Sequence, residues 1–222
     1  MHNFCSGELG GFYLDVIKDR QYTTQADSQP RRSAQTALYH LAEALACWIA
    51  PVLSFTAEEI WENLPGQHSQ SVFLTTWYEL PSDGEDDAFD DAFWSRCQQV
   101  RQDVNKALEA SRAEGQVRGS LDAKVVLYAN AELKSILERL DDELRFVLIT
   151  SDARCEPLDQ APADAFSGDL EGLKVLVIAS EAAKCERCWH KREDVGQVGE
   201  HPTICVRCVT NIDGDGEVRH YA

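Results

Sequence analysis

Apolar side chains in the first eighty residues recur at the spacing of buried helix faces. After Arg31 they fall three and four positions apart, at Ala34, Ala37, Leu38, Leu41, Leu45, Trp48, Ile49 and Val52. This spacing predicts an amphipathic helix, which we expect Pro51 to end or kink. A capping box formed by Thr56 and Glu59 predicts a second helix that runs to residue 64.

Two more stretches of this N-terminal part can be interpreted. Residues 71–80 are rich in aromatic and β-branched side chains and predict a short strand. Residues 4–17 hold enough apolar side chains to fill a helix face, yet no capping signal precedes them. We therefore expect this first helix to continue something longer. We also expect the chain to be a piece of a larger protein.

The middle of the chain predicts a small α+β unit behind a long helix. An acidic linker, residues 81–92, comes first, and the helix after it has Phe93, Val100, Val104 and Leu108 on one face. The unit itself should hold three strand-like runs and one helix: strands within residues 122–129, 145–156 and 173–180, and a helix over 131–144.

These patterns predict an α+β multidomain chain in four parts. The parts are a helical region (residues 1–80), an acidic linker with a long helix (81–116), a small α+β domain (117–180) and a four-cysteine, zinc-ribbon-like module (181–222). We call the last part the cysteine module.

The net charge of the chain argues against non-specific binding to polyanions such as nucleic acids. The chain of 222 residues has a formal net charge of −17, whereas proteins that bind polyanions without specificity are normally basic. The cysteine module is the least acidic part, with six Lys or Arg against eight Asp or Glu. Any contact with nucleic acid must therefore be confined to one region of the protein and depend on shape complementarity.

No apolar run is long enough to span a membrane, and no secretory signal is found at the N-terminus. We therefore expect a reducing compartment, the cytoplasm, and a monomeric protein without a membrane partner. In such a compartment, paired cysteines indicate a metal before a disulfide.

Four of the eight cysteines form two pairs of identical spacing. Cys185 and Cys188 are followed, after sixteen residues, by Cys205 and Cys208. Two C-x-x-C turns let four thiolates surround one zinc ion, and such a closed shell is structural because it leaves no position for water. Disulfides and an iron centre, which four thiolates also hold, are the alternatives.

Basic and aromatic residues surround these cysteines. Their mixture suits contact with phosphates and stacking of bases, and the candidates are Arg187, Trp189, His190, Lys191, Arg192, Arg207 and Arg219. Equally, Trp189 could cover the metal site while the charges are only solvated. The pattern alone leaves both interpretations open.

Catalytic motifs are not found in the sequence. It contains no GxGxxG, P-loop, HExxH or GxSxG motif. Adjacent carboxylates such as Glu58 and Glu59 are interpreted as solvated faces of helices. We therefore predict no catalytic residue in this chain.

At this point the residues resemble a known family. "GGFYLDVIKDRQY", "RRSAQTALYHLAEALACWIAPVLSFTAEEIWENLP" and "SVFLTTWYELP" are similar to the anticodon-binding helical domain of class I aminoacyl-tRNA synthetases for branched aliphatic amino acids. "FWSRCQQVRQDVNKALEASRAEGQVRGSLDAKVVLYA" resembles the segment that follows, and "CERCWHKREDVGQVGEHPTICVRC" resembles the C-terminal zinc module of bacterial isoleucyl-tRNA synthetases. The resemblance covers the whole chain.

The resemblance implies a role in protein biosynthesis. The intact ligase joins isoleucine to its tRNA with ATP, through an adenylate formed upstream on HIGH- and KMSKS-type motifs that this chain lacks, as it lacks the editing domain. The chain alone is then expected to bind no ATP, to be non-catalytic and to hold tRNA. The four cysteines match the zinc ligands of the family, and further tRNA contacts are expected at Lys18, Arg20, Tyr22, Arg31 and Arg32.

Two rival interpretations stay open. DNA glycosylases of the formamidopyrimidine type end in a similar finger, but they use an N-terminal proline nucleophile, and this chain begins Met1-His2. We therefore expect no DNA partner. The second rival is a zinc-ribbon module that binds a protein and no tRNA.

Overall fold

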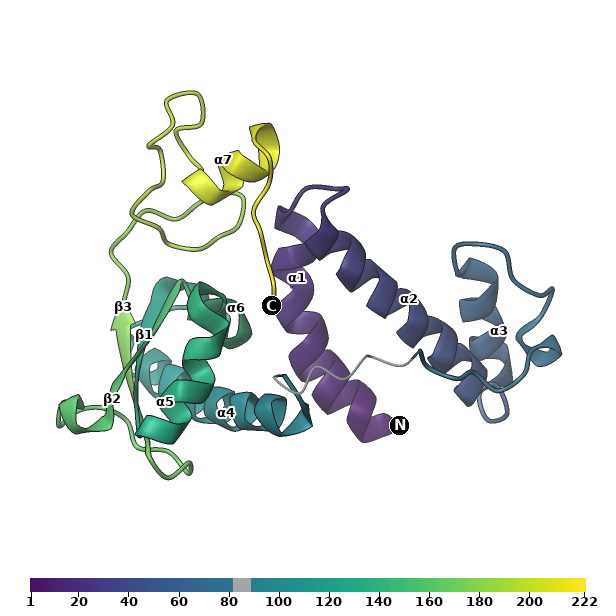
Figure 1. Ribbon diagram of the computed structural model, residues 1–222, viewed down its shortest axis with the longest axis horizontal. Coiled ribbons are helices and arrows are strands. Elements are labelled where there is room, and N and C mark those ends of the chain that lie inside the picture. Colours follow the sequence, from purple (N-terminus) through teal and green to yellow (C-terminus); the bar gives the residue numbers. More distant parts are fainter. Residues whose placement is uncertain (82–88) are drawn as a thin grey trace. The chain divides into compact units, whose positions relative to one another are not determined.

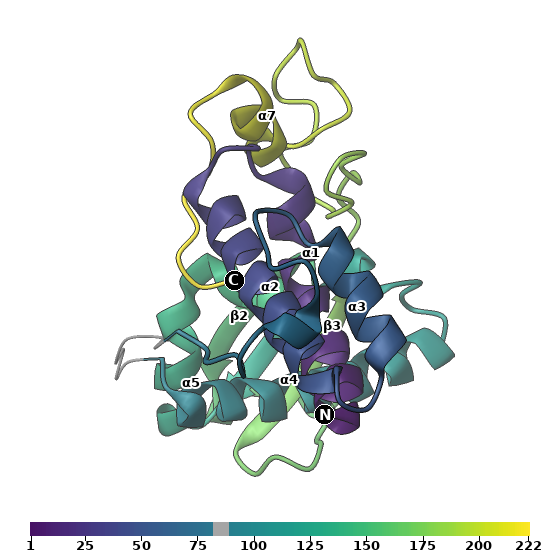
Figure 2. The same cartoon turned by 90° about the vertical axis from the view of Figure 1, so that its right-hand side faces the viewer.

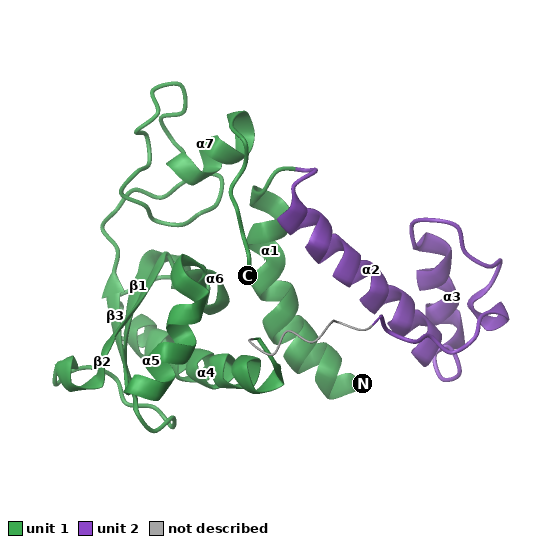
Figure 3. Cartoon of the chain, viewed as in Figure 1, with its two compact units in different colours: residues 1–25, 87–222 green, residues 26–86 purple. Residues whose placement is uncertain are grey.

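The computed structural model describes residues 1–81 and 89–222. It divides the chain into two compact units, residues 1–25 with 87–222 and residues 26–86, which Figure 3 shows in different colours. Residues 82–88 of the predicted acidic linker lie outside the described part. The mixed α and β architecture is confirmed, whereas the four-part division stays a prediction.

The unit of residues 26–86 is helical. Helix α2 spans Gln29–Ile49, with Pro30 in its first turn, and it ends just before Pro51 as predicted. Helix α3 spans Ser54–Asn63. Their facing sides form a small core made of Ala46, Cys47, Ala50, Ala57, Trp61 and Val72.

The predicted capping box is wrong. Helix α3 begins two residues before Thr56, and its N-terminus has no side-chain cap. The tight turn after α2 starts the helix instead, since Ser54 Oγ donates to the carbonyl of Ala50 at 3.0 Å and the amide of Ala57 donates to Leu53 at 2.9 Å. Thr56 therefore lies inside the first turn.

The strand predicted at residues 71–80 is also wrong. One turn of 3₁₀ helix, Val72–Leu74, is followed by extended chain that pairs with no strand in the described parts of the protein. The Glu58 carboxylate accepts hydrogen bonds from Ser71 Oγ and from the amide of Val72, both at 3.0 Å. The Glu58 side chain of α3 thus supplies hydrogen-bond acceptors to the start of this segment, where a neighbouring strand would otherwise supply them.

The larger unit begins with a helical rod. Turns of π-helix, η1 (Phe4–Tyr13), lead directly into helix α1 (Leu14–Thr23). Arg101 of the long helix α4 (Asp91–Ala113) holds this rod, because it donates to the carbonyl of Gly11 at 2.8 Å and pairs with Asp15 at 3.3 Å. Helix α1 therefore has a fixed place within its unit.

A three-stranded sheet organises the rest of this unit. Strands β1 (Ala123–Ala129), β2 (Asp152–Pro157) and β3 (Leu173–Ala179) lie in the order β2-β1-β3, with β1 parallel to β2 and antiparallel to β3 (Figure 1). In this register Leu127 lies opposite Cys155 and Val175. The parallel pair requires a crossover connection, which α5 (Ala131–Leu137), the turn η4 (Glu138–Glu143) and α6 (Leu144–Leu148) provide.

Two parts of the sequence prediction are wrong at this crossover, the start of the second strand and the single helix before it. Residues 145–148, expected as strand, are helical, and β2 starts only at Asp152. Asp141 (φ +47°) breaks the predicted single helix, and Ile149 (φ +56°) ends α6 in the left-handed region. A short apolar run fits a buried helix as well as a strand.

Helix α4 (Asp91–Ala113) confirms the long predicted helix. Asp90 caps it by accepting from the amide of Phe93 at 2.8 Å. Its buried face packs with β1, α5 and α6 in one core that includes Val100, Val104, Leu127, Leu137 and Leu148. Figure 2 shows helices α4 and α5 from a second side. Short 3₁₀ turns at Ser120–Asp122 and Leu158–Gln160 complete the unit's connections.

The cysteine module follows β3 and consists of loops around helix α7 (Val206–Asp213). A final extended segment returns to the core, where Tyr221 and Ala222 pack. Within the described residues, no helix is both long and apolar enough to cross a membrane.

Candidate metal centre

The first cysteine pair lies in a tight backbone turn. The amide of Cys185 donates to the carbonyl of His190, and the amide of Trp189 donates to the carbonyl of Cys185, both at 2.9 Å. Trp189 has φ +66°, which L residues rarely adopt. The turn therefore buries Cys188 and His190 while it leaves Trp189 between them 61% exposed.

The second pair lies at the start of α7. Cys205 is the N-cap residue of this helix, and Cys208 lies in its first turn. The amide of Cys205 donates to Cys185 Sγ at 3.3 Å, so the backbone of one pair already contacts a sulfur of the other. The positive φ of Gly196 (+77°) closes the loop between the pairs, where a Cβ would lie 2.8 Å from the carbonyl of Pro202.

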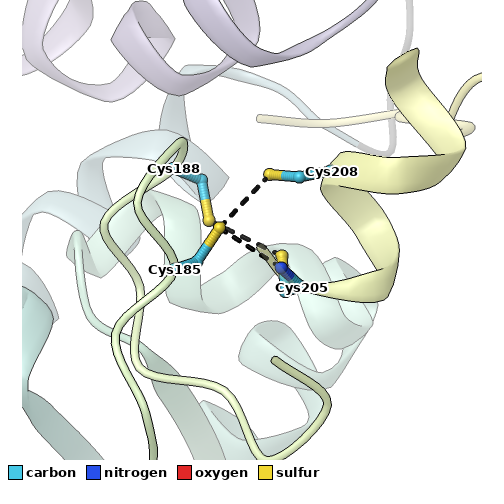
Figure 4. Close-up of side chains that lie close together, drawn as sticks. All are labelled: Cys185, Cys188, Cys205 and Cys208. Atoms are coloured by element: carbon cyan, nitrogen blue, oxygen red, sulfur yellow. Dashed lines mark hydrogen bonds between the residues drawn. The ribbon is translucent and has the colours of Figure 1, made fainter. Parts of the chain in front are cut away.

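The four sulfurs form one buried cluster. All lie within 4.8 Å of one another, and the Cys185–Cys208 and Cys188–Cys205 pairs are 3.7 and 3.8 Å apart (Figure 4). Bonds of about 2.3 Å to a tetrahedral zinc ion require sulfur separations of about 3.8 Å. The donor set and these distances fit zinc.

The thiol groups of the cluster also interact electrostatically. The pKa of Cys188 is lowered by hydrogen bonds from the thiols of Cys205 and Cys208. The pKa of Cys205 is raised to about 12, first by its hydrogen bond to Cys188, and that of Cys208 is raised for the same reason. The thiols thus share their protons through these hydrogen bonds, and a zinc ion would displace the protons because it binds the thiolate form.

A buried ionic cluster joins this module to α1. Arg207 donates to both oxygens of Asp19, at 2.7 and 2.8 Å, and Arg219 donates to Asp19 Oδ1 at 2.9 Å. Glu217 pairs with Arg207 at 3.1 Å. Burial raises the pKa of Asp19, but the hydrogen bonds and charge of Arg207 outweigh it and hold that pKa far below its ordinary value. We call these four residues the Asp19 cluster.

The C-terminal segment is tied to the core next to this cluster. Glu143 accepts hydrogen bonds from the amides of His220, Tyr221 and Ala222, at 2.6, 2.8 and 2.7 Å. The guanidinium of Arg219 lies 3.4 Å from the ring centroid of Phe146. Core, α1 and cysteine module therefore meet at one polar junction.

A cleft of about 440 Å³ opens between α1 and the first cysteine turn. Lys18 and Tyr22 line it from α1, and Arg187 and Trp189 line it from the turn. Tyr22 is 78% exposed. Val16 and Phe146 contribute to its largely apolar lining. The cleft therefore combines exposed rings with cations.

The predicted tRNA-contact residues separate into groups in the structure. Lys18, Tyr22, Arg187 and Trp189 gather at the cleft. His190, Arg207 and Arg219 are buried or nearly so, with 4%, 12% and 2% of their side chains exposed, and this argues for a structural role.

The other candidates lie elsewhere. Lys191 donates to the carbonyl of Ser180 at 2.8 Å, and Arg192 pairs with Asp194 at 3.9 Å. Burial lowers the pKa of Arg20. Arg31 and Arg32 belong to the other compact unit.

Sequence reasoning missed Asp19, Glu143 and Phe146. Asp19 lies among the cations of "KDRQY" (residues 18–22). A carboxylate at such a position on a helix is ordinarily solvated, so the sequence does not mark it as a functional residue. Its partners are nearly two hundred residues away, and no local signal announces them.

The comparisons with known proteins agree with this geometry. Residues 1–127 match the family described as anticodon-binding domain of tRNA ligase, and residues 183–211 match the zinc finger found in FPG and IleRS. That match and the four-cysteine cluster together support a structural zinc.

The curated relatives are isoleucine–tRNA ligases. The chain is 59% identical over 223 residues to that of Alcanivorax borkumensis, 56% over 222 to that of Teredinibacter turnerae and 58% over 226 to that of Pseudomonas entomophila. Each match covers 100% of this chain and 24% of the relative. The chain thus spans about a quarter of the length of these relatives.

The zinc finger alone does not separate a tRNA ligase from a DNA glycosylase, because its family includes both. The anticodon-binding match separates them, since it covers more than half of the chain. The chain belongs to the family of anticodon-binding domains of tRNA ligases.

Proposed function

We propose that this chain is the tRNA-binding C-terminal region of an isoleucine–tRNA ligase. It holds the anticodon arm of the isoleucine acceptor, while other parts of the ligase attach isoleucine with ATP. The observation that carries the proposal is the cleft in which Tyr22 and Trp189 are exposed beside Lys18 and Arg187. The family match and the relatives support it.

The chemistry of the cleft suits unpaired bases. Proteins that bind single-stranded loops stack bases on aromatic rings, and cations beside these rings take the phosphates. Trp189 is exposed because of its left-handed backbone, and Lys184 Nζ lies 5.6 Å from the centroid of its ring. The ring thus keeps one cation close to any base that stacks on it.

The acidic character of the chain fits a local contact. Most of the net charge of −17 lies outside the cysteine module and repels the phosphate backbone. Only a loop that reaches the cleft gains stacking and phosphate contacts there. Repulsion elsewhere then favours the correct pose over non-specific binding.

One zinc ion held by Cys185, Cys188, Cys205 and Cys208 gives the module its rigidity. Four thiolates close the coordination shell, so the ion stabilises the fold and activates no water. We further propose that the protein is cytoplasmic and monomeric, that ATP binds elsewhere in the ligase, and that neither DNA nor a membrane is a partner.

Fluorescence anisotropy with a labelled anticodon stem-loop of isoleucine tRNA tests this function. We expect micromolar or tighter binding that weakens steeply as salt increases. Trp189→Ala should weaken it about tenfold, because stacking on an aromatic ring contributes about 1–3 kcal/mol per base. The zinc content should stay at one ion per chain.

Two controls make the result specific. Ile178→Ala removes an exposed apolar side chain of β3, outside the residues 1–127 that match the anticodon-binding family, and should leave affinity unchanged. A stem-loop of another tRNA should bind more weakly. Absence of binding at moderate salt would favour the rival, a module that binds a protein partner.

A further inference from the structure

We propose that Asp19 is a positioning residue, whose carboxylate fixes the cysteine module against α1 and so sets the width of the cleft between Tyr22 and Trp189. The expected effect of this positioning on RNA affinity rests on the proposed function. The placement of the module does not depend on it, so the two claims can be tested separately.

One carboxylate connects three segments of the chain. Arg207 reaches Asp19 from α7, next to the ligand candidate Cys208, and Arg219 reaches it from the C-terminal segment. Both guanidinium groups also lie over the ring of Phe146, at 5.1 and 3.4 Å from its centroid. Asp19 is the point at which α1 meets both arms of the module.

Among the described residues the module meets α1 mainly through polar contacts, although Ala222 at its end shares the apolar core cluster with Val16. The apolar cluster of the module consists of the four cysteines and Ile204, with Val195 and Val209 at its edge, and it includes no residue of α1. Beyond the Asp19 cluster, Arg187 donates to the carbonyl of Thr23 at 2.5 Å, and Gln25 donates to the carbonyl of Gly214 at 2.7 Å. Both of these bonds lie at the C-terminal end of α1, where they can act as a hinge.

The cleft is the space that this attachment controls. Lys18 and Tyr22 lie on either side of Asp19 in the sequence of α1, and they form one wall. Arg187 and Trp189 form the facing wall. Without the Asp19 carboxylate the hinge bonds remain, but the direct link from the middle of α1 to Arg207 and Arg219 is lost. Trp189 would then lose its position relative to Tyr22.

The opposite role for Asp19 is that of a plain negative charge near RNA. The two roles predict effects of opposite sign. Neutralising a simple charge makes the protein less repulsive, so RNA should bind more tightly. Neutralising a positioning residue should weaken binding even though the net charge becomes less negative.

The decisive variant is Asp19→Asn, which keeps the shape of the side chain and removes its charge. We expect its affinity for the isoleucine anticodon stem-loop to fall at least tenfold, with one zinc ion still bound. Asp19→Glu, which restores a carboxylate, should return affinity to within about threefold of the wild type.

Asp15→Asn is the matched control. Asp15 lies one turn earlier on α1, lines the same cleft and pairs with the exposed Lys18 at 2.9 Å. It undergoes the same change of charge, but its ion pairs are with Lys18 and Arg101 and not with the module, and Arg101 keeps its hydrogen bond to the carbonyl of Gly11. Its affinity should be unchanged or slightly higher.

Hydrogen exchange decides the proposal without RNA. In zinc-loaded Asp19→Asn, amides of residues 217–222 and 187–190 should exchange faster, while those of β1 stay protected. Unchanged exchange in these segments would overturn the proposal, as would wild-type RNA affinity or loss of zinc from this variant. If the wild-type chain binds no RNA, the proposed function fails and the exchange result still judges Asp19.

Discussion

The α/β core and the cysteine module belong to the same compact unit, yet different forces stabilise them. The core is a continuous apolar cluster in which residues such as Leu127, Leu137 and Val147 are fully buried. The buried cluster of the module contains one apolar side chain other than cysteine, Ile204. Its order therefore depends on a metal ion and on charged contacts.

This difference explains how the two regions divide the work. A core that is stabilised by burial of apolar side chains keeps its structure without a ligand. It can therefore hold α1 and the three strands in place. A module of about forty residues buries too little surface to fold by itself. In our proposal a metal ion and ion pairs make it rigid, while Trp189 stays exposed at its surface.

Loss of one metal ligand should have the largest effect. Cys188→Ser removes one of four thiolates, so we expect release of zinc and loss of folding free energy on the order of 10 kcal/mol in the module. Metal analysis and hydrogen exchange should show an unfolded 181–222 beside an intact β1. Cys5→Ser, at an exposed cysteine, is the control, and full retention of zinc in Cys188→Ser would contradict the assignment.

A core cavity should have a smaller effect, confined to the other region. Leu127→Ala should reduce the free energy of unfolding of the α/β core by about 2–5 kcal/mol, because Leu127 is 0% exposed in β1. Zinc stoichiometry should stay at one. The control is Val126→Ala on the opposite, half-buried face of the strand, measured by the same urea titration. A drop in zinc content with Leu127→Ala would show that the regions are not independent.

Glu143→Gln tests the junction between the two regions. The carboxylate accepts three backbone hydrogen bonds, and the neutral amide should weaken them by about 1–3 kcal/mol in total. Faster amide exchange at residues 219–222 is the expected readout. Glu138→Gln, at a half-exposed side chain paired with Lys134, should leave those amides unchanged. Equal exchange in both variants would refute the junction.

Acid should have the smallest effect on the core. Burial raises the pKa of Asp103, but hydrogen bonds from the amides of Leu170 and Asp169 and from Lys106 lower it overall. Because the folded pKa lies below the unfolded value of about 3.9, the stabilisation is present above about pH 4 and is lost as the pH falls through the folded pKa.

Asp103→Asn should therefore flatten the acid dependence of core stability, followed through the amides of β1 so that loss of metal does not interfere. The variant loses part of this stabilisation near neutral pH as well. An acid profile as steep as that of the wild type would show that another group is responsible.

The regular elements could be predicted where one periodicity was clear. The apolar face with Val100 and Val104 predicted α4, and short strand-like apolar runs predicted β1 and β3. Residues 145–148 were misassigned because a short apolar run fits both a helix and a strand. The left-handed backbone at Asp141 and Ile149, which sets the boundaries there, leaves no mark in the sequence.

The site divides in the same way. The spacing of the four cysteines predicted that their sulfurs gather, and they lie within 4.8 Å of one another; zinc itself stays a proposal with family support. The Asp19 cluster was beyond prediction, because its residues meet only after α1, the core and the module have packed. The sequence predicts Arg207 and Arg219 as RNA contacts, because it does not show which cations have a buried partner in the folded chain.

The most direct test of the account is RNA affinity with and without the metal. The zinc-loaded chain, the chelated chain and the chelated chain with zinc restored are titrated with the isoleucine anticodon stem-loop at one salt concentration. The account predicts that binding is lost on chelation and recovered when zinc is added back. Equal affinity in the metal-free state would contradict it, because the RNA would then bind without the module that holds Trp189.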